Sequence, residues 1–214
     1  LGTASNEDSV APKVESIVSK AEDNDTVDDN DTVIVTCAEP VTNATALNTS
    51  NYRVEDEAVF ERAVFIDANK TTVKLTLKAG AIKENGPKVI SVVGIKDAAG
   101  NTMTPHSEPV DLTENVRPEL RSVAVSTVDT LALKFSEPVS VDSSKVEVYV
   151  NGVKVTPANI EPSTADPDAT WDVTLSEPLD AGDKVKVAIA AGGYTDANGN
   201  AGGKVEKEVT VTAN

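Results

Sequence analysis

The sequence predicts an all-β protein made of two tandem β-sandwiches, and three observations support this prediction. The composition favours strands, because the chain holds 32 Val, 8 Ile and 22 Thr against 10 Leu, and β-branched side chains prefer strands. One set of short motifs occurs twice in the same order, about 98 residues apart. Apolar and polar residues alternate in short runs that are separated by turn residues.

The internal repeat divides the 214-residue chain into two copies. Four pairs of segments align at an offset of 98 or 99 residues, whereas the Pro before the first strand recurs after 106 residues. The larger offset places an insertion of seven to eight residues in copy one, at Glu22–Asp31. We expect an N-terminal extension or linker over 1–9, one domain over 10–115 and a second over 116–214. The aligned pairs are Val33–Val41 with Leu131–Val139, Val73–Leu77 with Trp171–Leu175, Lys96–Asn101 with Thr195–Asn200, and Val110–Thr113 with Val209–Thr212.

Each copy offers seven short strands. Val146, Val148 and Val150 alternate with polar residues, which is typical of a strand with one buried and one solvated face. Asn151-Gly152 follows and predicts a two-residue hairpin loop, and no window of ten residues has helical periodicity. The expected strands are Val14–Val18, Val33–Cys37, Tyr52–Val54, Val64–Ile66, Thr71–Leu77, Lys88–Val93 and Val110–Leu112, then Leu120–Val125, Leu131–Phe135, Val146–Val150, Val153–Val155, Thr170–Leu175, Lys184–Ile189 and Val205–Val211.

Seven strands in about 100 residues, joined by polar turns, are typical of an Ig-like Greek-key β-sandwich, with a partly closed barrel as the lesser option. A single Cys cannot form an intrachain disulfide, so hydrophobic packing must hold each sandwich. Trp171 stands at the position of Val73 and is expected to anchor the second core. Cys37 is expected to point into the first core. Pro12 and Pro118 mark the first strand of each copy as a candidate edge strand.

The net charge excludes several classes of partner. Lys and Arg number 19 and Asp and Glu 35, which gives 19 − 35 = −16. Nucleic acids and anionic membrane surfaces both require a basic face, and no apolar run approaches the ~18 residues of a membrane span. We therefore expect neither nucleic acid binding nor membrane insertion. The chain shows no signal peptide or initiator Met, so we expect an excised piece or a mature form.

No residue set predicts an enzyme. His106 follows Pro105 in an expected surface loop, and no nucleophile motif accompanies it. A buried Cys37 thiol resists ionisation and is a poor nucleophile. Aromatic residues make up 3% of the chain, which leaves no platform for a sugar substrate. We expect no catalytic residue.

The insertion Glu22–Asp31 carries six acidic residues and no basic one. It is either a solvated loop or a Ca²⁺ site, since Ca²⁺ takes six to eight hard oxygens; the spacing is not that of an EF-hand. In an Ig-like sandwich this loop lies at the end of the domain from which the chain continues to domain two. The insertion is therefore expected to face the turn at Asp196–Asn200 across the linker Glu114-Asn115. The predicted ligands are Asp23, Asp25, Asp28, Asp29 and Asp31 from the insertion, with Asp196, Asn198 and Asn200 from domain two.

The turns Asp97–Asn101 and Asp196–Asn200 also have a structural interpretation. Asp and Asn side chains bind nearby backbone N–H groups, and Gly supplies a positive φ.

The repeated motifs resemble the bacterial Ig-like domains of surface-layer proteins. The resemblance rests on Ala38-Glu-Pro-Val41 with Asp97-Ala-Ala-Gly-Asn101, and in copy two on Phe135-Ser-Glu-Pro-Val139, Leu179-Asp-Ala-Gly182 and Asp196-Ala-Asn-Gly-Asn200. Copy one departs from the pattern at Lys78-Ala-Gly80.

That resemblance implies a structural protein. Such domains are strung in tandem in the lattice-forming part of the subunit, at the bacterial cell surface, and many such lattices depend on Ca²⁺. The implied partners are neighbouring copies of the protein and adjacent domains of its parent chain. The alternative is a spacer or binding module of a secreted adhesin or carbohydrate-active enzyme.

Overall fold

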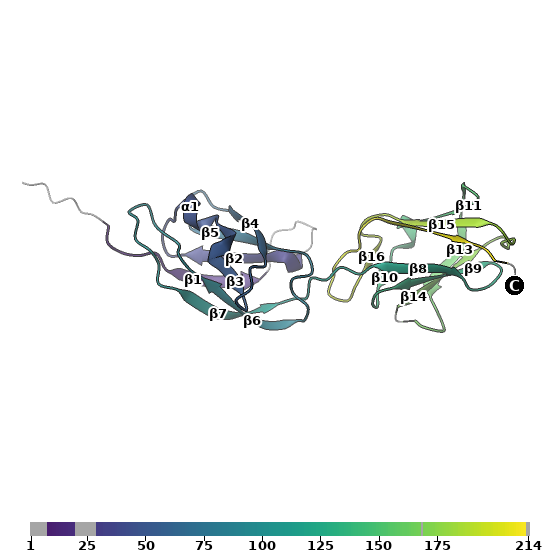
Figure 1. The fold of residues 1–214 in the computed structure, drawn as a ribbon, viewed down its shortest axis with the longest axis horizontal. Coiled ribbons are helices and arrows are strands. Elements are labelled where there is room, and N and C mark those ends of the chain that lie inside the picture. Colours follow the sequence, from purple (N-terminus) through teal and green to yellow (C-terminus); the bar gives the residue numbers. More distant parts are fainter. Residues whose placement is uncertain (1–7, 20–28, 168, 213–214) are drawn as a thin grey trace, which may run out of the picture. The chain divides into compact units, whose positions relative to one another are not determined.

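The structure is a computed structural model that describes residues 8–19, 29–167 and 169–212. The chain divides into two compact units, Leu1–Val116 and Arg117–Asn214. The regular secondary structure of both units is almost wholly antiparallel β-strand (Figure 1), which confirms the all-β prediction. None of the helices in the described ranges is long and apolar enough to cross a bilayer.

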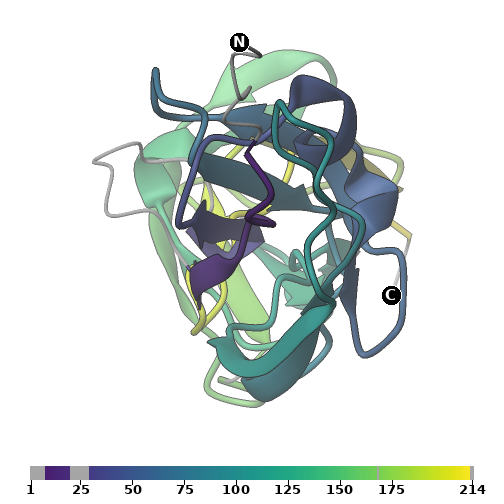
Figure 2. The same cartoon turned by 90° about the vertical axis from the view of Figure 1, so that its left-hand side faces the viewer.

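The N-terminal unit is a sandwich of a four-stranded and a three-stranded sheet (Figure 2). The strand orders are β1-β2-β5-β4 and β3-β6-β7. The chain passes from one sheet to the other after β2, after β3 and after β5, as in a Greek-key sandwich. The elements are β1 (Val14–Ser19), η1 (Asp29–Asp31), β2 (Thr32–Cys37), α1 (Asn43–Ala46), η2 (Thr49–Asn51), β3 (Tyr52–Val54), β4 (Phe60–Phe65), β5 (Thr72–Leu77), β6 (Gly86–Val92) and β7 (His106–Leu112).

The C-terminal unit repeats this topology and adds to it. Its sheets have the orders β13-β14-β9-β8 and β12-β11-β15-β17, and β10 pairs with β16 in a two-stranded ladder. The added β12 forms the predicted hairpin with β11, through Asn151 at φ 49° and Gly152 at φ 81°. The elements are β8 (Leu120–Val125), β9 (Thr130–Phe135), β10 (Ser140–Val141), η3 (Ser143–Lys145), β11 (Val146–Val150), β12 (Val153–Val155), β13 (Pro157–Pro162), β14 (Thr170–Leu175), β15 (Lys184–Ile189), β16 (Tyr194–Thr195) and β17 (Val205–Thr210).

Every predicted strand overlaps an observed one, and three observed strands were not predicted. Of these, β10 and β16 have only two residues each. The third, β13, occupies the place that β4 has in the first unit. Its sequence lacks alternation and has Pro at both ends, a composition that argues against a strand except at an edge. The edge position explains why both Pro are tolerated.

Each unit has its own apolar core. In the first, Leu75 and Tyr52 are fully buried, and the Tyr52 hydroxyl donates a hydrogen bond of 2.7 Å to the Ala46 carbonyl. Cys37 is buried in the same core, which confirms its predicted position. Trp171 was expected to anchor the second core, but it is only half-buried at the margin. Its indole nitrogen donates to the Val139 carbonyl at 3.1 Å, so the polar edge of the ring has a partner within the protein.

The first strand of each unit is an edge strand, as its Pro predicts. The register of β1 shifts between Val14 and Ser16, and that of β8 shifts between Leu120 and Ser122. Bulges twist an edge away from pairing with another chain. Both units therefore protect the same edge in the same way.

Candidate functional site

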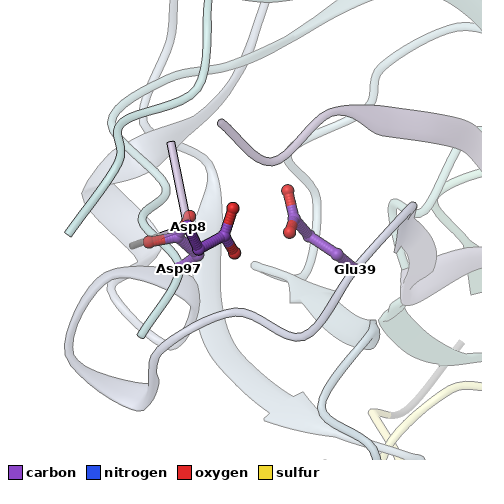
Figure 3. A group of neighbouring side chains, drawn as sticks. All are labelled: Asp8, Glu39 and Asp97. Atoms are coloured by element: carbon purple, nitrogen blue, oxygen red, sulfur yellow. The ribbon is translucent and has the colours of Figure 1, made fainter. Parts of the chain in front are cut away.

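Three carboxylates from separate segments meet in the N-terminal unit. Asp8 precedes β1, Glu39 follows β2 and Asp97 follows β6. One carboxylate oxygen from each lies within 4.8 Å of those of the other two. Figure 3 shows Glu39 facing the other two carboxylates. Within the described ranges, no other three His, Cys, Asp or Glu side chains come this close together.

Asn101 binds two of the three members of the acidic cluster (Asp8, Glu39 and Asp97). Its side-chain amide donates to Asp97 Oδ2 at 2.7 Å and to the carbonyls of Asp8 and Val10 at 3.0 and 3.1 Å. The Asn101 backbone N–H donates to Asp97 Oδ1 at 2.8 Å. The turn between Asp97 and Asn101 closes through Gly100 at φ 92°, a conformation that favours Gly. One asparagine therefore ties the N-terminal segment to the turn after β6.

The three carboxylates differ in electrostatic environment. Desolvation, followed by the negative charges of Asp8 and Asp97, raises the pKa of Glu39. Burial alone would raise the pKa of Asp97, but hydrogen bonds from Asn101 and from the neighbouring backbone together lower it. Asp97, 4% exposed, therefore stays ionised, and Glu39 bears the repulsion between like charges. A cation is the partner that would relieve this repulsion.

The C-terminal unit repeats the turn. Asp196 Oδ1 accepts hydrogen bonds from the backbone N–H groups of Asn198 and Asn200, and Oδ2 accepts from the Asn200 side chain at 2.8 Å. Gly199 has φ 89°. These contacts confirm the structural interpretation of both turns. They also bring three of the predicted metal ligands, Asp196, Asn198 and Asn200, together within one turn.

The predicted ligands in the acidic insertion are placed only in part. Asp23, Asp25 and Asp28 lie outside the described residues. Asp29 begins η1, and Asp31 ends it and accepts a hydrogen bond from Asn115. That the insertion shares a cation with domain two stays a prediction.

The acidic cluster was missed at the sequence level. Its members are distant in sequence, and Asp8 falls in the segment assigned to an extension or linker. The repeat did carry a signal, since Glu39 and Asp97 have counterparts in Glu137 and Asp196. The strand β2 runs from Asp31 towards Glu39, so the cluster and the end of the insertion lie at opposite ends of that strand.

Cys37 and His106 are the other two residues that could take part in chemistry, and both have a structural explanation. Burial raises the pKa of the Cys37 thiol to about 11, so the thiol is protonated at neutral pH. His106 was expected in a surface loop, but it begins β7, half-buried, with Nε2 at 3.2 Å from Glu108 Oε2. The other carboxylate oxygen of Glu108 accepts the Ile17 backbone N–H at 2.9 Å, which links β7 to the edge strand β1.

The fold and these turns define a class of protein. Residues 106–211 match the bacterial Ig-like domain family, and this range covers nearly all of the C-terminal unit. The C-terminal unit therefore resembles a bacterial Ig-like domain, and the N-terminal unit shares its topology and its motifs.

Similarity to a particular protein follows from sequence. The chain is 29% identical over 113 residues to the surface-layer 125 kDa protein of Lysinibacillus sphaericus, a match that covers 53% of this chain and 9% of that protein. The resemblance to Ig-like domains of surface-layer proteins is thereby confirmed. The chain thus spans less than a tenth of the length of this relative.

Two solved structures are also similar to this chain. Domains 1–6 of the surface-layer protein SbsC are 12% identical, with 96% of this chain and 41% of that one covered and a TM-score of 0.39. The titin fragment I67–I69 is 10% identical, with 95% and 65% covered and a TM-score of 0.38.

Proposed function

We propose that this chain is a structural segment of a bacterial surface-layer subunit and contributes two Ig-like modules to a lattice outside the cell. The observation that supports this role is the match to the surface-layer 125 kDa protein over 113 residues. The partners are then neighbouring copies of the protein and the adjacent domains of its parent chain. Among the residues that the structure describes, none of the groups brought together by the fold supports an enzymatic role.

The proposed role is mechanical. Each unit is laddered by antiparallel strands over most of its length, so a load along the chain must break many hydrogen bonds together. A net charge of −16 limits unspecific aggregation. Prolines and bulges at the edge strands also limit aggregation, because they hinder pairing of an edge with another chain.

Deletion of the pair from the parent protein tests this role. We expect the intact parent to form ordered sheets by negative-stain electron microscopy, and the parent without residues 10–212 to lose them or to change their lattice spacing. An unchanged lattice would contradict the proposal. An unchanged lattice together with lost glycan binding would favour a binding module instead.

We also propose that the acidic cluster binds Ca²⁺. Its carboxylates supply hard oxygens from three segments, and Ca²⁺ accepts carbonyl and water oxygens for the rest of its shell. The cation would join the segment before β1 to the turns after β2 and β6. It would thereby stabilise the end of the sandwich from which the chain enters.

Glu39→Gln is expected to reduce the stabilisation by Ca²⁺. Without Ca²⁺ the variant should melt at the same or a higher temperature, since one of three repelling charges is removed. With Ca²⁺ at 100 times its dissociation constant, the intact site gains about 2.7 kcal/mol, and the variant should gain less than half of that. Calorimetry of the 214-residue chain measures both. Glu61→Gln, an exposed position on β4, is the control for the same change of charge. Equal Ca²⁺ responses in the two variants would refute the site.

A further inference from the structure

The segment that follows β7 remains fastened to the N-terminal unit. The Glu114 backbone N–H donates to Asn85 Oδ1 at 2.7 Å, and the Val116 N–H donates to the Glu114 carboxylate. Asn115 between them is 2% exposed. Its backbone N–H donates to the Ile82 carbonyl at 3.0 Å. Glu114 and Asn115 are thus hydrogen-bonded through their backbone to the N-terminal unit, and Val116 is bound to Glu114.

The Asn115 side chain uses its whole amide in this attachment. Oδ1 accepts the Ile82 N–H at 2.8 Å, and Nδ2 donates to the Lys78 carbonyl at 3.1 Å and to Asp31 Oδ1 at 2.5 Å. The Asn115 carbonyl also accepts the Gly80 N–H at 2.8 Å. Hydrogen bonds to a charged acceptor are about twice as strong as neutral ones. The carboxylate of Asp31 therefore fixes the orientation of the amide.

The second copy uses the aligned aspartate differently. Asp129 lies 98 residues after Asp31, at the offset of the repeat. Its carboxylate accepts hydrogen bonds from the hydroxyls of Thr127 at 2.7 Å and Thr130 at 3.0 Å, within its own turn. In copy one, by contrast, Asp31 ends the acidic insertion and reaches a residue 84 positions away. The insertion that distinguishes copy one thus ends in a contact to the segment between the domains.

We propose that Asp31 and Asn115 form a clasp that fastens the connecting segment to the N-terminal unit and restricts its motion. Beyond the clasp, Arg117 precedes Pro118 and is restricted to extended backbone, while the ring of Pro118 fixes its own φ. Glu119 is bound to the second unit, because its N–H donates to Ser136 Oγ at 2.9 Å and its carbonyl accepts the Ser136 N–H at 2.9 Å.

With the clasp closed, the part of the connection between the clasp and Glu119 is Val116-Arg117-Pro118. Its opening would release the chain from the N-terminal unit back to the end of β7 at Leu112. This role does not depend on the proposed lattice or on Ca²⁺.

Hydrogen exchange on the full 214-residue chain tests the clasp. Asn115→Ala is expected to raise the exchange rates of the Gly80 and Ile82 amides at least tenfold, because Ile82 loses its acceptor directly. The amides of Val35 and Leu75 in the core of the same unit should keep their rates. Nuclear relaxation should also show higher mobility for residues 113–118.

Asp31→Asn removes the charge of Asp31 and keeps an acceptor oxygen. We therefore expect a smaller rise in the exchange rates of the same amides, between two- and tenfold. This variant also tests the clasp if Asn115→Ala does not fold. Asp129→Ala is the matched control and should leave the Gly80 and Ile82 amides unchanged. Wild-type exchange at both amides in Asn115→Ala, or in Asp31→Asn, would overturn the proposal.

Discussion

Leu75→Ala is expected to unfold the N-terminal unit at a lower denaturant concentration and to leave the C-terminal unit unaffected. Leu75 lies on β5 between β2 and β4, and its side chain has no exposed surface. Truncation of a buried Leu costs about 2–5 kcal/mol, as lost burial and as the cavity left behind. A domain of this size has about 5–15 kcal/mol of stability in total, so the shift will be large.

A single tryptophan makes the measurement selective. Trp171 is the only Trp of the chain and belongs to the C-terminal unit, so its fluorescence follows that unit alone. Circular dichroism follows both units. Leu75→Ala should move only the transition without a fluorescence change, and Leu133→Ala, equally buried in the second core, should do the reverse. A fluorescence transition displaced by Leu75→Ala would show that the two units do not unfold independently.

The fold could be predicted because its determinants are local. Strands with one buried face leave an alternating pattern, and β11 and β15 were found to the residue. The repeat then supplied a second copy of the same pattern. The prediction missed β13, an edge strand with little buried surface. Because few of its side chains are buried, its sequence has no alternation of apolar and polar residues.

The candidate site could be predicted only in part because it is assembled by tertiary structure. The turns at Asp97 and Asp196 were evident, since their hydrogen bonds join residues at most four positions apart. Asp8 and Glu39 reach Asp97 only when three loops meet at one end of the sandwich. The partner of Asp31 likewise lies 84 positions away. No spacing in the sequence indicates either contact.

Gly202→Ala is expected to destabilise the C-terminal unit by about 1–3 kcal/mol, the usual cost of overpacking a core. A Cβ at Gly202 would lie 2.0 Å from Cε2 and 2.2 Å from Cζ of Tyr194. The ring cannot move away easily, because Tyr194 is 3% exposed and packs against Phe135 at 5.1 Å between ring centroids. Gly203→Ala is the matched control: the next residue has an ordinary φ and open space around its Cβ position, and it should leave stability unchanged.

The first unit fills the corresponding space in its core with a different pair of side chains. At the aligned positions, Met103 stands for Gly202 and Ile95 for Tyr194. The same backbone hydrogen bond joins each pair, from Met103 N–H to the Ile95 carbonyl at 2.9 Å and from Gly202 N–H to the Tyr194 carbonyl at 2.8 Å. A small residue therefore accompanies the large ring in one copy, and two medium side chains share the space in the other.

A double-mutant cycle tests this exchange of volume. Gly202→Met should be more costly in the wild type than in a Tyr194→Ile background, by about 2 kcal/mol, because the smaller side chain vacates the space that Met needs. Urea unfolding monitored through Trp171 measures all four proteins. If Gly202→Met costs the same in both backgrounds, the two positions do not compete for one volume. Coupling of the expected size would instead show that the two copies fill one scaffold with interchangeable pairs of side chains.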